Sequence, residues 1–276
     1  MKILVFRKKV LIAVAAAAAV AVCAVVFSGS LSASVQTAAA QNRQLPIYSV
    51  KRDDNKASIS FDAAWGNEDT QQLIDILAKY QVKATFFVVG GWVDKYPESV
   101  KALADAGHEV MNHSNTHPYM TKLSSQGMLD EVNACADKVE KVTGVRPKLF
   151  RPPYGDYNDT LIRTLNENGF YGIQWSVDSL DWKELPASEI TQRVTSKIEA
   201  GSIVLFLNAA KHTPEALPGI LEAIAAKGIE LVPISQLIYT ENYKIDHTGQ
   251  QYAVEAPAPD SAATGATQLR KRSREW

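Results

Sequence analysis

The sequence predicts an α/β fold in which parallel strands alternate with helices. Short apolar segments alternate along the chain with longer amphipathic segments. Several amphipathic segments end at a glycine, the residue that most often follows a helix, as at Gly107, Gly144 and Gly228. Strands that alternate with helices pair in parallel, and right-handed crossovers then either close a barrel or wind an open sheet.

Seven segments have the character of strands. In the first, apolar residues alternate with serines until Asp62 ends the segment. The second, at 84–89, is apolar over most of its length, as is typical of a strand buried on both faces. The expected strands are 57–62, 84–89, 108–111, 148–150, 171–177, 202–207 and 230–232.

Helices are expected between these strands. The segment 70–80 places Leu73, Ile74 and Leu77 on one face, and Pro97 suits the first turn of another helix. The expected helices are 70–80, 97–106, 124–142, 159–168, 188–198 and 213–227, and a short helix follows the last strand.

The N-terminal segment predicts export. Four basic residues within 2–9 precede an uncharged run, 10–27, whose 18 residues would form a helix of about 27 Å. That length is close to the ~30 Å hydrocarbon core of a bilayer. We interpret 1–27 as a signal peptide or a signal-anchor helix, with the remaining chain outside the cytoplasm. A small-residue pattern at 38–40 suits cleavage, so secretion to the cell wall and membrane anchoring both stay open.

The rest of the chain divides into three parts. Residues 28–54 are small and polar and are expected to form a linker, and 55–240 form the folded domain. Residues 241–276 lack apolar periodicity and are expected to be a disordered tail, whose basic end is either solvated or in contact with anionic wall polymers. A monomer is expected.

Composition excludes some classes of function. The formal net charge is −1 and the basic residues are scattered, which argues against a nucleic-acid-binding surface. The two cysteines, Cys23 and Cys135, are too few for a disulfide framework or a cysteine-rich zinc site.

Two histidines, His113 and His117, lie four residues apart after the third strand. Neutral imidazole is the commonest transition-metal ligand, but this spacing alone is weak evidence. The ends of other strands add Asp62, Arg151 and Asp178, with Asn208 after the sixth strand. Because such positions meet at one face of a βα barrel, we expect these side chains to share one site.

Four ordered motifs resemble those of the polysaccharide deacetylases, the NodB-homology domains of carbohydrate esterase family four. They are Ser60-Phe61-Asp62, His113-Ser114-Asn115-Thr116-His117, Arg151-Pro152-Pro153-Tyr154-Gly155 and Asp178-Ser179-Leu180-Asp181-Trp182. The resemblance covers about 55–240 and implies a distorted (β/α)7 barrel. Within the family, 61–66 and 208–210 resemble the sporulation-type branch of Gram-positive bacteria.

The resemblance also implies an activity. Family members remove acetyl groups from N-acetylated sugars by using water activated on a divalent metal, usually zinc, with cobalt as an alternative. A cell-wall glycan, above all peptidoglycan, is therefore the expected substrate. A different amidohydrolase reaction on the same barrel remains an alternative, because a fold does not fix a substrate.

The resemblance further assigns roles to single residues. Asp62 matches the catalytic base, and His113 and His117 match the metal ligands. Arg151 matches the partner of the base, and the backbone N–H of Tyr154 matches the donor to the oxyanion. Other interpretations are a capping role for Asp62 and a rigid surface turn at Arg151.

Two further residues complete the expected pocket. Asp178 matches the carboxylate that tunes the general acid, and Trp182 matches a wall of the acetyl pocket, unless it is a core aromatic. Tyr154 and Trp182 are thus the expected contacts to substrate.

The chain departs from the family pattern at two positions. Ala63 replaces a metal-binding aspartate, and Asp69 is the nearest substitute, although it could equally cap the helix that begins at Thr70. Leu207 replaces the general-acid histidine, and leucine cannot donate a proton. His212 is the nearest substitute, although it could simply flank a helix. A degenerate deacetylase that binds glycan without turnover is therefore the alternative to an active enzyme.

Overall fold

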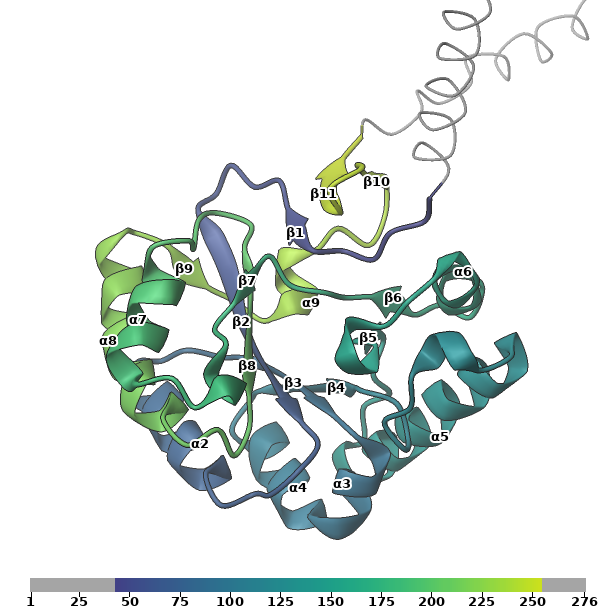
Figure 1. Ribbon diagram of the computed structural model, residues 1–276, viewed down its shortest axis with the longest axis horizontal. Coiled ribbons are helices and arrows are strands. Elements are labelled where there is room, and N and C mark those ends of the chain that lie inside the picture. The colour runs from purple at the N-terminus through teal and green to yellow at the C-terminus, as the bar shows by residue number, and fades with distance from the viewer. Residues whose placement is uncertain (1–42, 255–276) are drawn as a thin grey trace, which may run out of the picture.

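The computed structural model describes residues 43–254 (Figure 1). The expected export segment 1–27, most of the linker and the basic end of the chain lie outside the described residues. None of the helices in 43–254 is long and apolar enough to cross a membrane.

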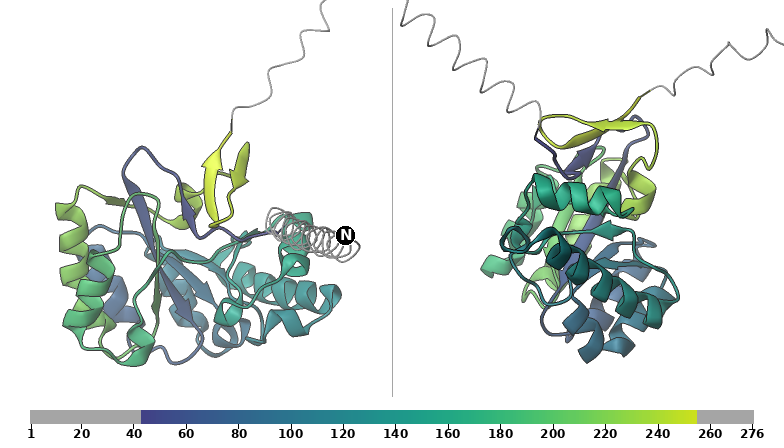
Figure 2. Two further views of the ribbon diagram at one scale, coloured as in Figure 1. Left: turned by 45° about the horizontal axis from the view of Figure 1, so that its top comes forward. Right: turned by 90° about the vertical axis from the view of Figure 1, so that its right-hand side faces the viewer.

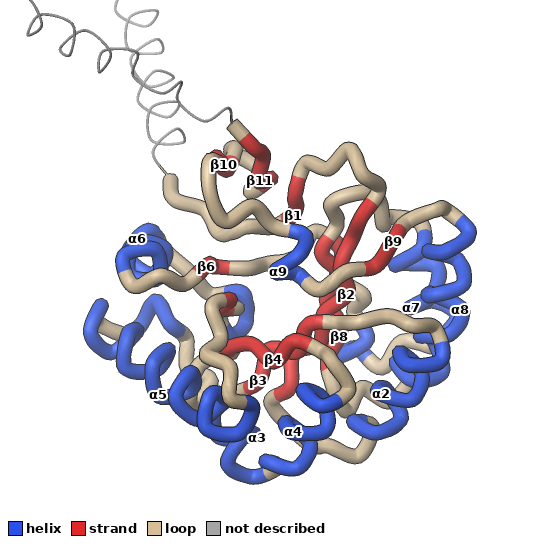
Figure 3. Tube along the Cα trace, turned by 180° about the vertical axis from the view of Figure 1, so that it is seen from behind, coloured by secondary structure: helices blue, strands red, loops and turns tan. Residues whose placement is uncertain are grey.

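A curled parallel sheet forms the centre of the domain (Figures 1 and 3). Its strands follow the order β6-β5-β4-β3-β2-β8-β7, and β9 pairs with the first residues of β2. The strands are β2 (Lys56–Ala63), β3 (Thr85–Val88), β4 (Glu109–Asn112), β5 (Leu149–Phe150), β6 (Tyr171–Gly172), β7 (Val177–Asp178), β8 (Ile203–Leu207) and β9 (Glu230–Leu231). The predicted α/β barrel of parallel strands is confirmed.

Helices surround the convex side of the sheet, as the blue segments of Figure 3 show. They are α2 (Thr70–Lys79), α3 (Gly90–Lys95), α4 (Pro97–Asp105), α5 (Ser125–Thr143), α6 (Asp159–Glu167), α7 (Ala187–Thr195) and α8 (Thr213–Ala226). The short helix α9 (Ile234–Leu237) lies on the other side of the strands, where it shares a buried cluster with Phe87 (Figure 3). All the predicted helices are present, with ends within three residues of those expected except for α9, which had no predicted bounds. Helix α3 was not predicted because it begins with two glycines.

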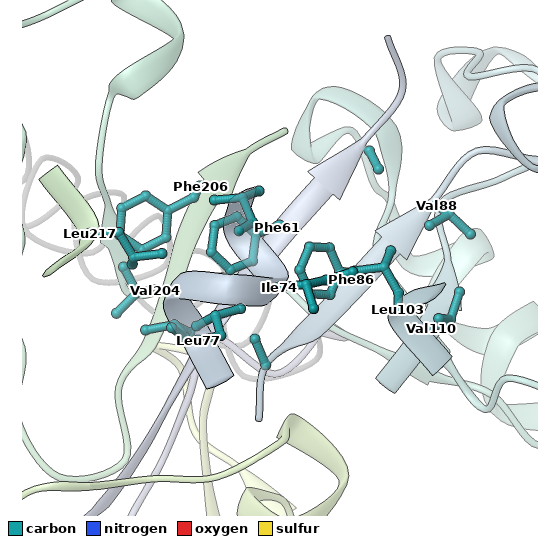
Figure 4. Close-up of a cluster of buried hydrophobic side chains, with 14 of the residues drawn as sticks. Phe61, Ile74, Leu77, Phe86, Val88, Leu103, Val110, Val204, Phe206 and Leu217 are labelled. Atoms are coloured by element: carbon teal, nitrogen blue, oxygen red, sulfur yellow. The ribbon is translucent and has the colours of Figure 1, made fainter. Parts of the chain in front are cut away.

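The main core lies between the sheet and these helices. Phe61 of β2 stacks on Phe86 of β3 at 4.8 Å and on Phe206 of β8 at 5.4 Å between ring centroids (Figure 4). Because side chains alternate along a strand, Asp62 and Leu207 then point to the concave side. The same alternation that builds the core therefore delivers polar and apolar groups to the interior of the barrel.

The chain before and after the barrel adds a second, small sheet. It has the order β1-β11-β10, where β1 is Ser49–Val50, β10 is Tyr243–Ile245 and β11 is Gln250–Ala253. Figure 2 shows the yellow strands β10 and β11 at one end of the barrel. The predictions of a linker up to residue 54 and of disorder from 241 were therefore wrong for these segments. Their strands are too short for a visible period, and their partners are distant in sequence.

Residues 47–50 also connect the edge strand β6 with the start of β8. Ile47 bridges to Ile173 beside β6, and the Val50 N–H donates to the Gly201 carbonyl at 2.9 Å, just before β8. The predicted strand 171–177 is accordingly split into β6 and β7, because the Gln174 N–H donates to the Ile47 carbonyl instead of continuing the ladder.

Candidate active site

The strand ends converge on a cavity of about 460 Å³. Its wall combines a few polar groups with many aromatic and aliphatic side chains, as is usual for small-molecule sites. The lining residues are Asp62, Ala64, Trp65, His113, His117, Tyr154, Gly155, Trp175, Asp178, Trp182, Leu205 and Leu207. The structure thus brings together the expected residues at the carboxyl ends of β2 and β7, the two histidines that follow β4, and Tyr154 of the loop after β5.

A buried ion pair lies at the base of the cavity. Arg151 is fully buried, and its Nη1 donates to Asp62 Oδ1 at 2.7 Å. Its Nη2 donates to the Gln174 carbonyl at 3.2 Å, and the guanidinium lies 4.1 Å from the ring centre of Phe87. Burial lowers the pKa of Arg151, while the neighbouring Asp62 opposes that change. The pair fixes the direction of the Asp62 carboxylate, and this is the pairing that the family resemblance implied.

The two histidines share the cavity with this carboxylate. His113 Nδ1 lies 2.8 Å from the Arg151 carbonyl oxygen, an arrangement in which Nδ1–H donates and Nε2 is left as an acceptor. That Nε2 is 3.6 Å from Asp62 Oδ2, and the rings of His113 and His117 are 5.0 Å apart. Burial lowers the pKa of His113, and it lowers the pKa of His117 to about 4. Both rings are therefore neutral near pH 7, the form that binds metals.

Glu131 of α5 holds the loop between the two histidines. Its Oε2 accepts from the backbone N–H groups of Asn115 and Thr116 at 2.9 and 2.8 Å, and its Oε1 accepts from the Thr116 hydroxyl at 2.8 Å. His117 itself has a left-handed backbone with φ of 61°. Glu131 was not predictable as a site residue, because it lies in the middle of an amphipathic helix.

The donor set fits a divalent metal only in part. Two neutral imidazoles in one cavity suit a transition metal. Within the described residues, however, no three His, Cys, Asp or Glu side chains gather as a metal site. Ala63, at the position of the missing aspartate, is a buried methyl group of β2.

Asp69 does not supply the missing ligand. It is buried and absent from the cavity wall, and its Oδ2 accepts from the Ala209 N–H at 2.8 Å. It occupies the residue before α2 but makes no side-chain capping hydrogen bond. Both expected roles of Asp69 are therefore replaced by a third, which is to hold the loop that follows β8.

His212 does not replace the missing acid. It precedes α8, is absent from the cavity wall, and places Nδ1 3.5 Å from Glu215 Oε2. Leu207 does line the cavity, so an alkyl group lies where the family resemblance implies an acid. Asp178 also lines it, with Oδ1 accepting from the Leu180 N–H at 2.9 Å.

Aromatic rings form the rim. Tyr154, Trp182 and Trp65 line the cavity while remaining more than half exposed, so Trp182 is not a core residue. Neither Trp65 nor Trp175 had a predicted role in the site, although Trp65 follows the strand of Asp62 closely. Asn208 shapes this rim, because its side-chain amide donates to the carbonyls of Trp65 and Gly66 at 2.7 and 2.8 Å.

Comparison with known proteins gives consistent matches. A family model described as polysaccharide deacetylase matches residues 49–173. The chain is 35% identical over 193 residues to YlxY of Bacillus subtilis, covering 70% of this chain and 60% of that protein. It is 31% identical over 192 residues to a peptidoglycan-N-acetylglucosamine deacetylase of Bacillus cereus, covering 67% of this chain and 70% of that enzyme. The chain thus spans less than two thirds of the length of YlxY.

A solved structure extends the comparison to the fold. BA3943 of Bacillus anthracis, described as a pseudoenzyme of the CE4 family, matches with a TM-score of 0.67 at 34% identity, covering 70% of this chain and 68% of that chain. A mutant of BA3943 described as having restored enzymatic activity matches with a TM-score of 0.68 at 35% identity, covering 70% of each chain.

Proposed function

Because the chain belongs to the polysaccharide deacetylase family, the NodB-homology domains of carbohydrate esterase family four, we propose that its cavity binds an N-acetylated cell-wall glycan without efficient turnover. Peptidoglycan is the proposed ligand, since the related Bacillus cereus enzyme is named for it. The observation that carries the proposal is Leu207, which lines the cavity where the reaction needs a proton donor.

The cavity has what glycan binding requires. Tyr154, Trp65 and Trp182 offer exposed rings, and the flat C–H faces of a sugar pack well on such rings. Deeper in the cavity, Asp62 offers an acceptor to an amide N–H. An acetamido group therefore finds both an apolar wall and a polar partner.

The cavity also holds residues that the proposed chemistry would use. Asp62, which Arg151 orients, would take a proton from an attacking water. A divalent metal, zinc or cobalt, would be held by His113 and His117, and it would polarise the acetyl carbonyl and acidify water. The leaving amine still needs a proton, which Leu207 cannot donate. Loss of general acid–base help costs about 10²–10⁴ in rate.

Acetate release tests this proposal against an active enzyme. Purified protein is incubated with zinc or cobalt on chitooligosaccharide and on peptidoglycan, and Asp62→Asn serves as the blank. The proposal expects saturable sugar binding with no acetate above that blank. Leu207→His, alone and with Ala63→Asp, is expected to raise acetate release by restoring the acid and the third ligand. If these variants bind sugar but release no more acetate than the wild-type protein, Leu207 and Ala63 are not the cause of the missing turnover.

Metal-dependent N-deacetylation is the second candidate, and the intact pairing of Asp62 with Arg151 favours it. If the wild-type protein releases acetate and His212→Ala does not change the rate, water or another group serves as the acid. For either function we propose an extracytoplasmic location, which rests on the sequence of 1–27. Fractionating cells into cytoplasm, membrane and wall tests that location.

A further inference from the structure

Tyr119 and Tyr154 form an exposed stacked pair at the edge of the cavity. Their ring centroids lie 4.3 Å apart, and their planes are 19° from parallel. The side chains are 54% and 56% exposed. Large apolar rings gathered at the surface indicate a binding surface more often than single exposed residues do.

The pair is held in place by the loops that carry it. Tyr119 lies in the loop after β4, and Tyr154 lies in the loop after β5. Asp156 joins the two loops, because its Oδ2 accepts from the Thr121 N–H at 2.8 Å and its Oδ1 accepts from the Thr121 hydroxyl at 3.0 Å. Met120 is fully buried beside Tyr119 in sequence and anchors that loop. Rings fixed in advance lose little freedom when a ligand covers them.

The backbone of Tyr154 also indicates that this loop belongs to a functional site. Its φ of 60° lies in the left-handed region, which a tyrosine adopts only when its surroundings hold it there. Strain of this kind gathers at functional sites. Here it accompanies a ring that faces solvent between the cavity and Tyr119.

The pair continues a series of rings that begins inside the cavity. The ring of His113 is 5.0 Å from that of His117, which is 4.5 Å from that of Tyr154, which in turn stacks on Tyr119. Tyr154 lines the cavity, whereas Tyr119 lies outside its lining. The series therefore leads from the floor of the cavity to the open surface.

We propose that the Tyr119–Tyr154 pair is an outer sugar-binding subsite. It holds the pyranose ring next to the one whose acetamide group enters the cavity. This inference rests on the proposed glycan binding and extends it from a single sugar to an oligomer. The outer ring, Tyr119, provides the stacking face, and its hydroxyl is free to exchange hydrogen bonds with the sugar hydroxyls.

Titrations with sugars of different length test the subsite. The cavity tryptophans Trp65, Trp175 and Trp182 provide a fluorescence signal for occupancy, and the ligands are N-acetylglucosamine and its β-1,4-linked tetrasaccharide. For Tyr119→Ala we expect the tetrasaccharide affinity to fall about two- to tenfold. The affinity for the monosaccharide should not change. Tyr119→Phe is the matched control and should retain most of the tetrasaccharide affinity, because the stacking ring is still present.

The outcomes separate the two proposals. Equal tetrasaccharide affinity in Tyr119→Ala and the wild-type protein overturns the subsite and leaves glycan binding intact. An equal loss for the monosaccharide also overturns it, because Tyr119 would then act on the cavity itself. If the wild-type protein binds neither sugar, the proposed glycan binding fails, and the subsite fails with it. Thermal melting of each variant confirms that the fold is unchanged.

Discussion

Asp62→Ala tests whether the buried ion pair holds the base of the site together. The substitution leaves the fully buried Arg151 guanidinium without its charge partner. Removing one member of a buried pair costs about 3–5 kcal/mol in the free energy of unfolding. Asp62→Asn keeps an oxygen acceptor at the same place, so its cost should be smaller, about 1–2 kcal/mol.

Urea denaturation followed by circular dichroism at pH 7 measures these differences. Asp105→Ala is the matched control, because it breaks the exposed Lys101–Asp105 pair on α4, which should contribute little. The double variant Asp62→Ala/Arg151→Met should lose less than the sum of the two single changes. If the free energy of unfolding of Asp62→Ala lies within about 0.5 kcal/mol of the wild-type value, the ion pair does not stabilise the site.

Three other predictions concern separate parts of the domain. Gly201→Ala should lower the free energy of unfolding by more than about 2 kcal/mol in urea denaturation, because φ is +83° and a Cβ would meet the Val50 carbonyl oxygen at 1.6 Å. An unchanged denaturation midpoint would show that the close contact between Val50 and Gly201 does not require a glycine. Burial raises the pKa of the Asp181 carboxyl from 3.8 to about 6. Between these two pH values the folded protein keeps a proton that the unfolded chain loses, so the free energy of unfolding should fall by about 3 kcal/mol as the pH rises from 3.8 to about 6. Asp181→Asn should abolish this pH dependence. Glu131→Ala should weaken zinc binding about 10–100-fold in a chelator competition, since the Thr116 loop loses its acceptors; unchanged affinity would show that the loop holds itself.

The periodic parts of the fold were predictable from the sequence. The alternation of Ile59 and Phe61 with polar residues, and the glycines after helices such as α5, located the main strands and helices. The family resemblance then predicted the barrel, and the similarity to BA3943 confirms it. These signals are local, so a sequence displays them directly.

The missed elements depend on distant partners. Residues 47–50 and 243–253 form strands only because they pair with each other and with segments near Ile173 and Gly201. Helix α3 begins at Gly90, where a Cβ would meet the Asn115 side chain at 2.4 Å, so its glycine reflects a tertiary contact. None of these pairings leaves a period in the sequence.

The candidate site likewise contains some residues whose positions were predictable from the sequence and others whose positions were not. Asp62 lies near the carboxyl end of β2, and His113 and His117 follow β4, so their convergence was predictable from parallel topology. The positions of Asp69 and His212 were not predictable, because closeness along the chain does not determine which groups meet in space. In space Asp69 binds the Ala209 amide, and His212 faces Glu215.

Binding and turnover measured in one sample test the proposed function most directly. Chitotetraose is titrated into the zinc-supplemented wild-type protein by calorimetry, and the recovered sample is assayed for acetate against Asp62→Asn. We predict saturable binding with acetate no higher than in that control. Acetate released well above the control would contradict the incomplete machinery inferred from Leu207, and the absence of any binding heat would contradict the glycan site itself.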